Sequence, residues 1–143
     1  MKTLGIDYGE RRMGLAATDE AGIMAHALDT IERAGDTSDF ERLAEIVAAE
    51  EVTLIVVGMP YNMDGTRGFK AEEVDRFIEE LKDHVDVPIE TWDERLSTAR
   101  AEREMLAADM SRAKRARRRD RIAAQFILQS YLDAHKTPSN EID

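Results

Sequence analysis

Three acidic residues from distant parts of the chain, Asp7, Glu94 and Asp120, have surroundings that are unusual for surface carboxylates. Asp7 ends a short apolar run and precedes a Tyr-Gly pair, while Glu94 follows a second short run just before a predicted helix start. Asp120 lies inside an arginine-rich tract at residues 112–121. Carboxylates that a fold brings together can hold a hard divalent cation, and a basic tract beside them would attract a phosphate backbone. The combination predicts a metal-dependent nuclease.

Composition limits the class of protein. The chain has 143 residues and is 43% hydrophobic, which fits one domain with a single buried core. It has no cysteine, which excludes disulfides, thiolate nucleophiles and cysteine zinc sites. No apolar stretch approaches the roughly 20 residues that span a membrane, and the N-terminus reaches a charge too early for a signal peptide. We therefore expect a soluble, cytoplasmic protein without membrane partners, with one domain at residues 1–136 and a short tail at residues 137–143.

The charge is strongly uneven along the chain. The net charge is −10, from 30 acidic and 20 basic residues. Residues 112–121 hold seven basic residues and one acid, so the remainder carries 29 acids and 13 bases, a balance of −16. A focused basic patch can steer a polyanion even when the total is negative. The plainer alternative is a solvated helix face, and the acidity could equally reflect a high-salt cytoplasm or codon bias.

Apolar patterning predicts a mixed sheet covered by helices. Short apolar runs at residues 3–7, 13–18 and 23–28 predict an antiparallel meander. Ser38 with Glu41 has the spacing of a capping box. The later elements are a helix to about residue 51, a buried strand at 54–57, a helix at 74–81, a strand at 88–92, a helix capped by Ser97 or Thr98 and running to 106, and a final helix at 122–132.

Each motif has a structural alternative to a functional role. Asp7 with its following glycines could serve only a turn. Residues 58–68 form a long glycine-bearing loop after the buried strand, a place where ligands commonly bind, and Asn62, Thr66 and Arg67 could touch phosphate there. Ordinary helix electrostatics would also favour an acid at Glu94. The combination of a strand acid, a strand-end acid and a last-helix acid carries the prediction, because one particular fold must bring them together.

The chain resembles the YqgF family, the RuvX-type Holliday junction resolvases, which are also described as nucleases for the precursor of small-subunit ribosomal RNA. The resemblance runs through residues 3–133. Its motifs are residues 4–9 with Arg12 and Gly14, residues 57–65, residues 93–98 with Ala101 and Glu102, and residues 120–129. It implies an α/β ribonuclease-H-like fold with a five-stranded mixed sheet, the first three strands antiparallel and helices on both faces. It also implies that Asp7, Glu94 and Asp120 are the catalytic acids.

Our main hypothesis is a two-metal phosphodiesterase. Asp7 would bridge two Mg²⁺ or Mn²⁺ ions roughly 4 Å apart, and Glu94 and Asp120 would each complete one site. The expected nucleic-acid contacts are Arg12, Asn62, Thr66, Arg67, Arg112, Lys114, Arg115, Arg117, Arg118 and Arg119. The substrate would be structured RNA or branched DNA, handled by a monomer or homodimer. The resemblance implies processing of the 5′ end of pre-16S rRNA, with Holliday junction cleavage in DNA recombination or repair as the alternative.

Two other classes of function stay open on the sequence alone. One is a nucleotide-binding module, because actin-like ATPases share this sheet topology, although those enzymes need two such domains. The other is a nucleic-acid-binding protein that does not cut. Binding that survives metal removal, without turnover, would distinguish the second class from a nuclease.

Overall fold

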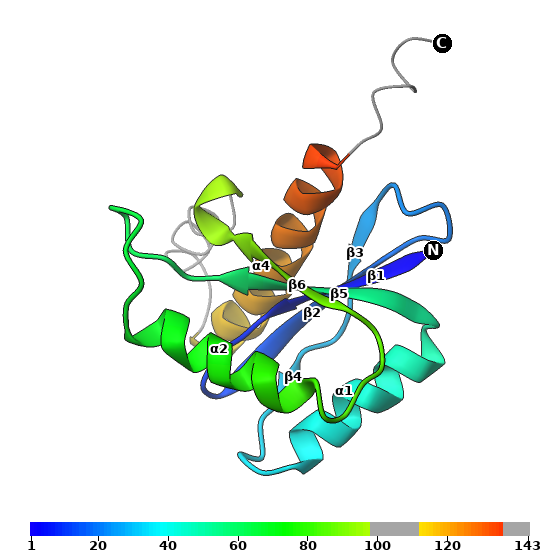
Figure 1. The fold of residues 1–143 in the computed structure, drawn as a ribbon, viewed down its shortest axis with the longest axis horizontal. Coiled ribbons are helices and arrows are strands. Elements are labelled where there is room, and N and C mark those ends of the chain that lie inside the picture. The colour runs from blue at the N-terminus through cyan, green and yellow to red at the C-terminus, as the bar shows by residue number, and fades with distance from the viewer. Residues whose placement is uncertain (98–111, 136–143) are drawn as a thin grey trace, which may run out of the picture.

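The structure is a computed structural model that describes residues 1–97 and 112–135, with the backbone alone at residues 112–120. The helix that we expected to run to residue 106 and the tail at residues 137–143 lie outside the described residues. The described part folds around one mixed sheet (Figure 1). Its elements in chain order are β1 (Lys2–Asp7), β2 (Arg12–Thr18), β3 (Ala25–Ala27), β4 (Ile31–Glu32), α1 (Ser38–Ala49), β5 (Val52–Met59), α2 (Phe69–Leu81), β6 (Ile89–Asp93), the 3₁₀ helix η1 (Glu94–Leu96) and α4 (Arg112–Ala134).

The sheet joins an antiparallel half to a parallel half. Its strand order is β3-β2-β1-β5-β6, with β4 paired to β2. β1, β2 and β3 pair antiparallel, whereas β1, β5 and β6 pair parallel. The prediction that the first three strands are antiparallel is confirmed. The predicted number of five strands is wrong for the described residues, which form six, because β4 has only two residues and leaves no periodic pattern.

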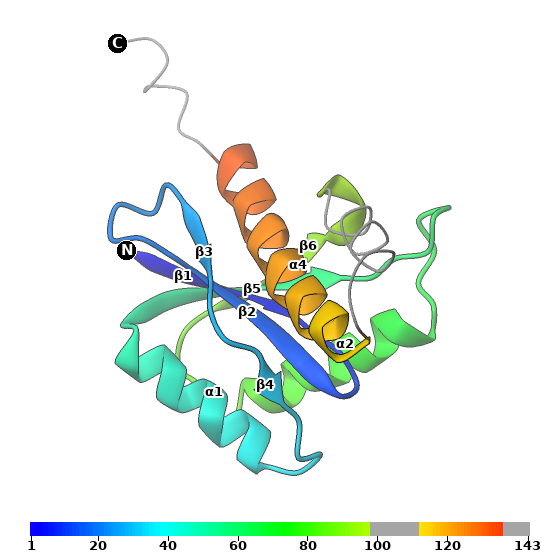
Figure 2. The same cartoon turned by 180° about the vertical axis from the view of Figure 1, so that it is seen from behind.

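Helices cover both faces of the sheet, as predicted. Figures 1 and 2 show α1 and α2 on one face and α4 on the other. The first face buries the larger core, in which Leu4 and Ile6 of β1 pack with residues such as Leu43 of α1 and Val74 of α2. Because side chains alternate along a strand, Gly5 points to the other face, where a smaller cluster includes Ala124 and Leu128 of α4.

Glycines let α4 lie close to the sheet. A Cβ atom at Gly5 would lie 2.8 Å from Leu128 Cβ, and one at Gly58 would lie 2.7 Å from Ile127 Cδ1. Both distances are shorter than real Cβ atoms show, so these two positions of β1 and β5 need glycine at this separation. The close packing fixes the long helix against β1, which ends in Asp7, and against β5, which lies between β1 and β6 in the sheet.

α4 runs antiparallel to β3. Near the start of β3, Gln129 Nε2 donates to the Ile23 carbonyl and Gln129 Oε1 accepts from the Ala25 amide. Just after the end of β3, Arg121 Nε donates to the Leu28 carbonyl. β3 and β1 have the same direction because both pair antiparallel with β2. The N-terminal half of α4 therefore lies toward the edge of the sheet at which β1 ends in Asp7.

The predicted capping box at α1 is wrong. The N-cap residue is Thr37, and no side-chain hydrogen bond caps the helix. Ser38 is the first helical residue, and its amide and hydroxyl both donate to Asp36 Oδ1. The nearby Asp36 supplies a short-range acceptor that competes with the capping arrangement. The acid that reaches back from the first turn is Asp39, which accepts from the amides of Ala34 and Gly35.

Candidate active site

Asp7 and Glu94 meet at one edge of the sheet. Asp7 ends β1, and Glu94 begins η1 directly after β6. Both strands run parallel to β5, so their carboxyl ends reach the same edge. Asp7 is 4% exposed and Glu94 is 5% exposed, and both line one cavity of about 990 Å³. Two of the three predicted acids, far apart in sequence, therefore line the same cavity.

Strand pairing and a tight turn position Asp7. Asp7 pairs with Gly14 of β2, and the chain then turns through residues 8–11, called here the Tyr8 turn. A Cβ atom at Gly9 would lie 2.4 Å from the Arg12 carbonyl oxygen, so only glycine fits this turn. The glycine that follows the strand acid in the sequence is thus explained by a close approach of backbone to backbone.

Two features position Glu94: the N-cap of η1 and a glycine in the neighbouring strand β5. The Asp93 side chain accepts from the amide of Arg95 at 2.9 Å, which starts η1. A Cβ atom at Gly58 would lie 3.0 Å from Glu94 Oε1 and 3.1 Å from Glu94 Cγ. The Glu94 side chain therefore lies directly against the β5 backbone, in space that any larger residue at position 58 would occupy.

The loop at residues 60–68, called here the Asn62 loop, forms the other side of the cavity. The Asn62 amide donates to the Thr66 carbonyl at 2.9 Å, and the Asn62 side chain donates to Thr66 Oγ1 at 2.9 Å. Asp64 accepts from both the amide and the hydroxyl of Thr66. These hydrogen bonds from Thr66 hold the pKa of the Asp64 carboxyl below its usual value. The loop is thus shaped mainly by its own polar residues.

Arg95 ties the Asn62 loop to the strand that precedes Glu94. Its guanidinium pairs with Asp93 at 2.7 Å, donates to the Met63 carbonyl at 3.3 Å and lies 5.6 Å from the centre of the Tyr61 ring. The hydrogen bonds to Asp93 raise the pKa of Arg95. Sequence reasoning missed this role of Arg95, because Met63 and Tyr61 come from a distant loop and no local pattern marks those two contacts.

The predicted phosphate-binding residues separate into two groups. Arg12 and Asn62 line the cavity. Thr66 and Arg67 do not line it: Thr66 is engaged within its own loop, and Arg67 pairs with Asp75 and lies 5.9 Å from the centre of the Tyr61 ring. Lys70 and Arg11 also line the cavity and were missed, because neither belongs to a recognisable motif.

The third predicted acid and the basic tract are placed only by their backbone. Asp120 and the tract belong to the first half of α4, so the tract is the start of a helix. The direction of α4 carries this half toward the edge of Asp7 and Glu94. The side chains of Asp120, Arg112, Lys114, Arg115, Arg117, Arg118 and Arg119 lie outside the described residues.

The residues present fit a hard divalent cation in part. Two buried carboxylates that line one cavity supply the oxygen ligands that Mg²⁺ and Mn²⁺ prefer. Among the side chains that the structure describes, no group of three or more His, Cys, Asp or Glu residues could hold a metal ion. The predicted metal-ligand set includes Asp120, whose side chain is outside the described residues. The complete set of three ligands therefore stays a prediction.

Two further findings bear on function. No helix within residues 1–97 and 112–135 is long and apolar enough to cross a membrane. A sequence profile of RuvX, described as Holliday junction resolvase, matches residues 1–134.

Known relatives cover nearly the whole chain. A protein of Myxococcus xanthus named "Putative pre-16S rRNA nuclease" is 43% identical over 141 residues, which cover 99% of this chain and 93% of the relative. A protein of Symbiobacterium thermophilum with the same name is 49% identical over 134 residues, which cover 94% and 93%. These identities lie well above the level at which a shared family is in doubt.

Solved structures support the fold. Thermus thermophilus RuvC in complex with a Holliday junction substrate matches with a TM-score of 0.57 at 14% identity, over 96% of this chain and 98% of that one. The fowlpox virus Holliday junction resolvase matches with a TM-score of 0.54 at 12% identity, over 94% and 99%. At such low identities the likeness shows the fold alone, and it agrees with the expected ribonuclease-H-like α/β architecture.

Proposed function

Because the chain belongs to the RuvX family, we propose that the cavity of Asp7 and Glu94 is the active site of a divalent-metal-dependent nuclease. One observation carries this proposal: acids from the ends of β1 and β6 are both buried and line the same cavity. Burying two carboxylates together is costly, and a bound divalent cation would offset that cost. An ordinary structural core would instead keep such groups apart or in water.

Asp120 is the proposed third acid. It directly precedes Arg121, which contacts the end of β3 at Leu28, so its backbone lies in the part of α4 nearest the strand ends. Position 120 also precedes the buried residues Ala123, Ala124 and Ile127 by one and two helical turns. This spacing puts it in line with the helix face that packs on the sheet, as a ligand for the same cavity requires.

The chemistry follows from the donor set. A divalent ion held by Asp7, Glu94 and Asp120 would supply a Lewis acid that polarises the phosphodiester and activates water. Arg12 and Lys70, which line the cavity, would contact phosphate oxygens and orient the substrate. Asn62 would contact it from the Asn62 loop, while Thr66 and Arg67 would keep that loop in shape.

The proposed physiological substrate is the 5′ end of pre-16S rRNA, processed in the cytoplasm during ribosome biogenesis. The names of the relatives favour it. The alternative is the four-way junction of DNA recombination, which the description of the family favours. Both substrates present bent or branched phosphate backbones, which a basic helix start beside a metal site can bind without reading base sequence.

Replacing Asp7 by asparagine tests the nuclease assignment. Asp7→Asn keeps the size of the side chain and removes the charge that holds the metal, so cleavage with Mg²⁺ or Mn²⁺ should fall by on the order of 10³-fold. Cleavage of a pre-16S rRNA fragment and of four-way junction DNA should be measured with one pure preparation. The matched control is Asp19→Asn, a half-buried acid of the β2–β3 turn that does not line the cavity and accepts from the Ile23 amide.

The outcomes separate the alternatives. Unchanged cleavage by Asp7→Asn would refute the assignment. Binding of either nucleic acid without cleavage by the wild type under any metal condition would identify a binder that does not cut. Preference for one substrate by more than about tenfold in kcat/KM would decide between RNA processing and junction cleavage.

A further inference from the structure

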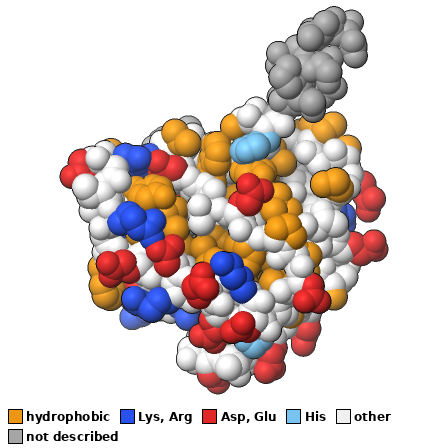
Figure 3. Space-filling view, in the orientation of Figure 1, with side chains coloured by type: hydrophobic (Ala, Val, Ile, Leu, Met, Phe, Trp, Pro, Cys, Tyr) orange, Lys and Arg blue, Asp and Glu red, His pale blue; other side chains and the backbone are white. Residues whose placement is uncertain are grey.

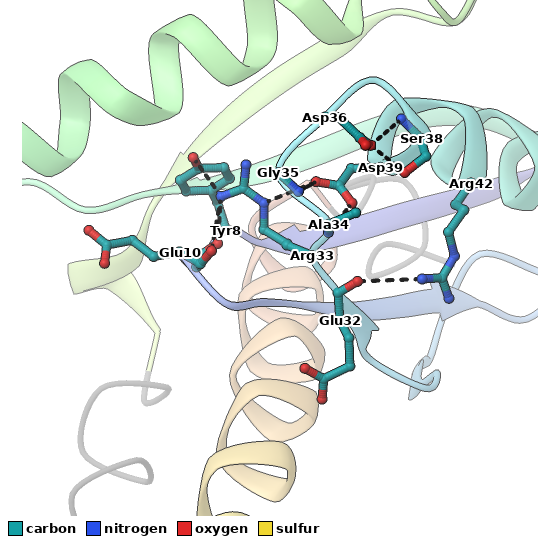
Figure 4. Close-up of polar contacts among 11 residues, drawn as sticks. Tyr8, Glu10, Glu32, Arg33, Ala34, Gly35, Asp36, Ser38, Asp39 and Arg42 are labelled. Carbon is teal, nitrogen blue, oxygen red and sulfur yellow. Dashed lines mark hydrogen bonds and ion pairs between the residues drawn. The ribbon is translucent and has the colours of Figure 1, made fainter.

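Arg33, which does not line the cavity of the acids, is joined to the turn that follows Asp7. Its Nη1 donates to Tyr8 Oη at 2.9 Å, to the Gly9 carbonyl at 3.0 Å and more weakly to the Glu10 carbonyl at 3.4 Å (Figure 4). Its guanidinium carbon also lies 4.8 Å from the centre of the Tyr8 ring. One side chain thus contacts three consecutive residues of the Tyr8 turn.

On the side of its guanidinium away from the Tyr8 turn, Arg33 forms an ion pair with Asp39. Its Nε lies 3.5 Å from Asp39 Oδ2, and the Asp39 side chain is only 2% exposed. Asp39 also accepts from the amides of Ala34 at 2.8 Å and Gly35 at 3.1 Å, so two backbone groups fix its carboxylate. Gly35 has a φ of +84°, a left-handed conformation that favours glycine and lets these amides turn onto Asp39.

The Arg33–Asp39 contact depends on charge. The Arg33 side chain is 17% exposed, and its buried Nε makes no hydrogen bond in the described structure although Asp39 is close. A neutral replacement for either residue would leave the other buried without its counterion. A lysine would keep the charge but would lack the planar fork that reaches Asp39 and the turn at the same time.

Tyr8 separates Arg33 from the candidate active site. Tyr8 lines both the cavity of about 990 Å³ that contains Asp7 and a second cavity of about 560 Å³ that contains Arg33. Its ring packs 4.8 Å from the Phe77 ring of α2. Glu73 of α2 also lines both cavities. The side-chain hydrogen bonds of Arg33, however, connect it to the first cavity through the Tyr8 turn.

We propose that Arg33 is a positioning residue for the nuclease reaction, which fixes the Tyr8 turn and through it the carboxylate of Asp7. The inference rests on the proposed function, because it assigns Arg33 a part in that reaction. A purely structural role would stabilise the fold without changing how the folded protein turns over. A positioning role predicts slower turnover by protein that is fully folded, since small displacements of a reacting group are costly.

Three variants test the proposal. Arg33→Lys keeps a cation beside Asp39, Arg33→Gln removes it, and Tyr8→Phe removes only the hydroxyl that Arg33 contacts. The matched control is Arg42→Gln, because Arg42 of α1 lies in the same region and its Nη1 donates at 3.5 Å to the carbonyl of Glu32, the residue before Arg33, and not to the Tyr8 turn (Figure 4). All four should be assayed below their unfolding temperatures, by cleavage kinetics and by amide hydrogen exchange without metal.

We expect kcat to fall about 10- to 100-fold in Arg33→Lys, with KM changed less than about threefold. Tyr8→Phe should lower kcat by about three- to tenfold, and both variants should exchange the Gly9 and Glu10 amides faster than the wild type. Arg42→Gln should match the wild type in kcat and exchange. If Arg33→Gln does not fold, Arg33→Lys and Tyr8→Phe still decide the question.

Two failures can be told apart. If the wild type cleaves and the Arg33 and Tyr8 variants keep its kcat and its exchange rates, the role of Arg33 is overturned and the proposed function stands. If the wild type does not cleave any of the substrates, the proposed function is overturned, and a role for Arg33 in that reaction is overturned with it.

Discussion

The two sides of the cavity are held in different ways. The Tyr8 turn is anchored from within, by Arg33 and a partner, Asp39, that is almost completely buried. The Asn62 loop is anchored at the surface, where the side chains of Arg95 and Arg67 are 32% and 44% exposed. Exposed ion pairs contribute little because water and salt screen them, whereas a buried pair is costly to break.

This difference matches what each side has to do. In the proposed nuclease Asp7 would hold a metal at a fixed position, and a rigid, desolvated anchor for the turn beside it would serve that role. The Asn62 loop would face a nucleic acid of variable shape, and contacts that open at low cost let such a loop adjust. We therefore infer a fixed catalytic side and an adaptable substrate side of one cavity.

The largest expected effect comes from breaking the buried anchor. Asp39→Asn should lower the free energy of unfolding by about 3 kcal/mol, because it leaves Arg33 without its counterion. Asp93→Asn, which weakens the more exposed pair with Arg95, should have a smaller effect. Urea unfolding of both variants measures the difference. Equal destabilisation would show that the two sides of the cavity are held equally firmly.

Gly58 tests the contact between the sheet and Glu94. Gly58→Ala places a Cβ atom 2.7 Å from Ile127 Cδ1 and 3.0 Å from Glu94 Oε1. It should cost about 1–3 kcal/mol of stability through overpacking, and displacement of Glu94 should lower kcat about tenfold. Urea unfolding and cleavage kinetics provide the measurements.

Gly5→Ala is the matched control for Gly58→Ala. Its Cβ atom would press on Leu128 of the same helix, at 2.8 Å, but not on Glu94. Because Leu128 Cβ can move less than the end of the Ile127 side chain, Gly5→Ala should destabilise the protein at least as much as Gly58→Ala and yet spare more of the activity. If both variants lose the same activity, overpacking of α4 explains the loss and the position of Glu94 does not.

Much of the fold could be predicted because its signals are local. The continuous apolar run in β5 and the spacing of Val74, Phe77, Ile78 and Leu81 mark a central strand and an amphipathic helix without knowledge of the rest. β4 could not be found, because two residues carry no period. The capping box failed because Asp36, outside the motif, captured Ser38.

The site was predictable where strand direction determines it. Acids that follow parallel strands reach the same edge, so Asp7 and Glu94 could be grouped from their positions alone. Arg33 could not be found, because its contacts with Tyr8 and Gly9 join segments far apart in sequence and a lone arginine has no pattern. The side-chain contacts of Asn62 and Thr66 within their own loop were equally invisible, since polar loop residues suit either role.

The two faces of the sheet also differ in charge, because the basic tract begins α4 while α1 and α2 are mainly acidic. Acidic side chains predominate on α1 and α2 (Figure 3), so a polyanion should approach from the side of α4. Changing Arg115, Arg117 and Arg118 to serine should weaken nucleic-acid binding and flatten its log–log salt dependence by roughly 0.7 to 0.9 for each phosphate that the variant no longer binds. An unchanged salt slope would place the binding face elsewhere, and Mn²⁺ affinity, which should stay nearly constant, is the control.

The smallest expected effect lies within the Asn62 loop. Hydrogen bonds from Thr66 lower the pKa of Asp64, so the folded loop favours the carboxylate. That stabilisation is present above the ordinary carboxyl pKa of about 3.9 and is lost as the pH falls through the lower pKa of the folded state. Thr66→Val removes the hydroxyl donor but keeps the amide, so the pKa of Asp64 should rise part of the way toward its ordinary value.

NMR titration of the Asp64 carboxyl carbon measures this rise, and Asp36, whose pKa is lowered by Ser38 in a separate turn, is the internal control. The loop is exposed and held by several weak contacts. At neutral pH, Thr66→Val should therefore change neither the equilibrium constant of unfolding nor the kcat by more than about twofold. A large loss of activity in Thr66→Val would show that the Asn62 loop is as rigidly required as the Tyr8 turn, and the distinction between a fixed and an adaptable side would fail.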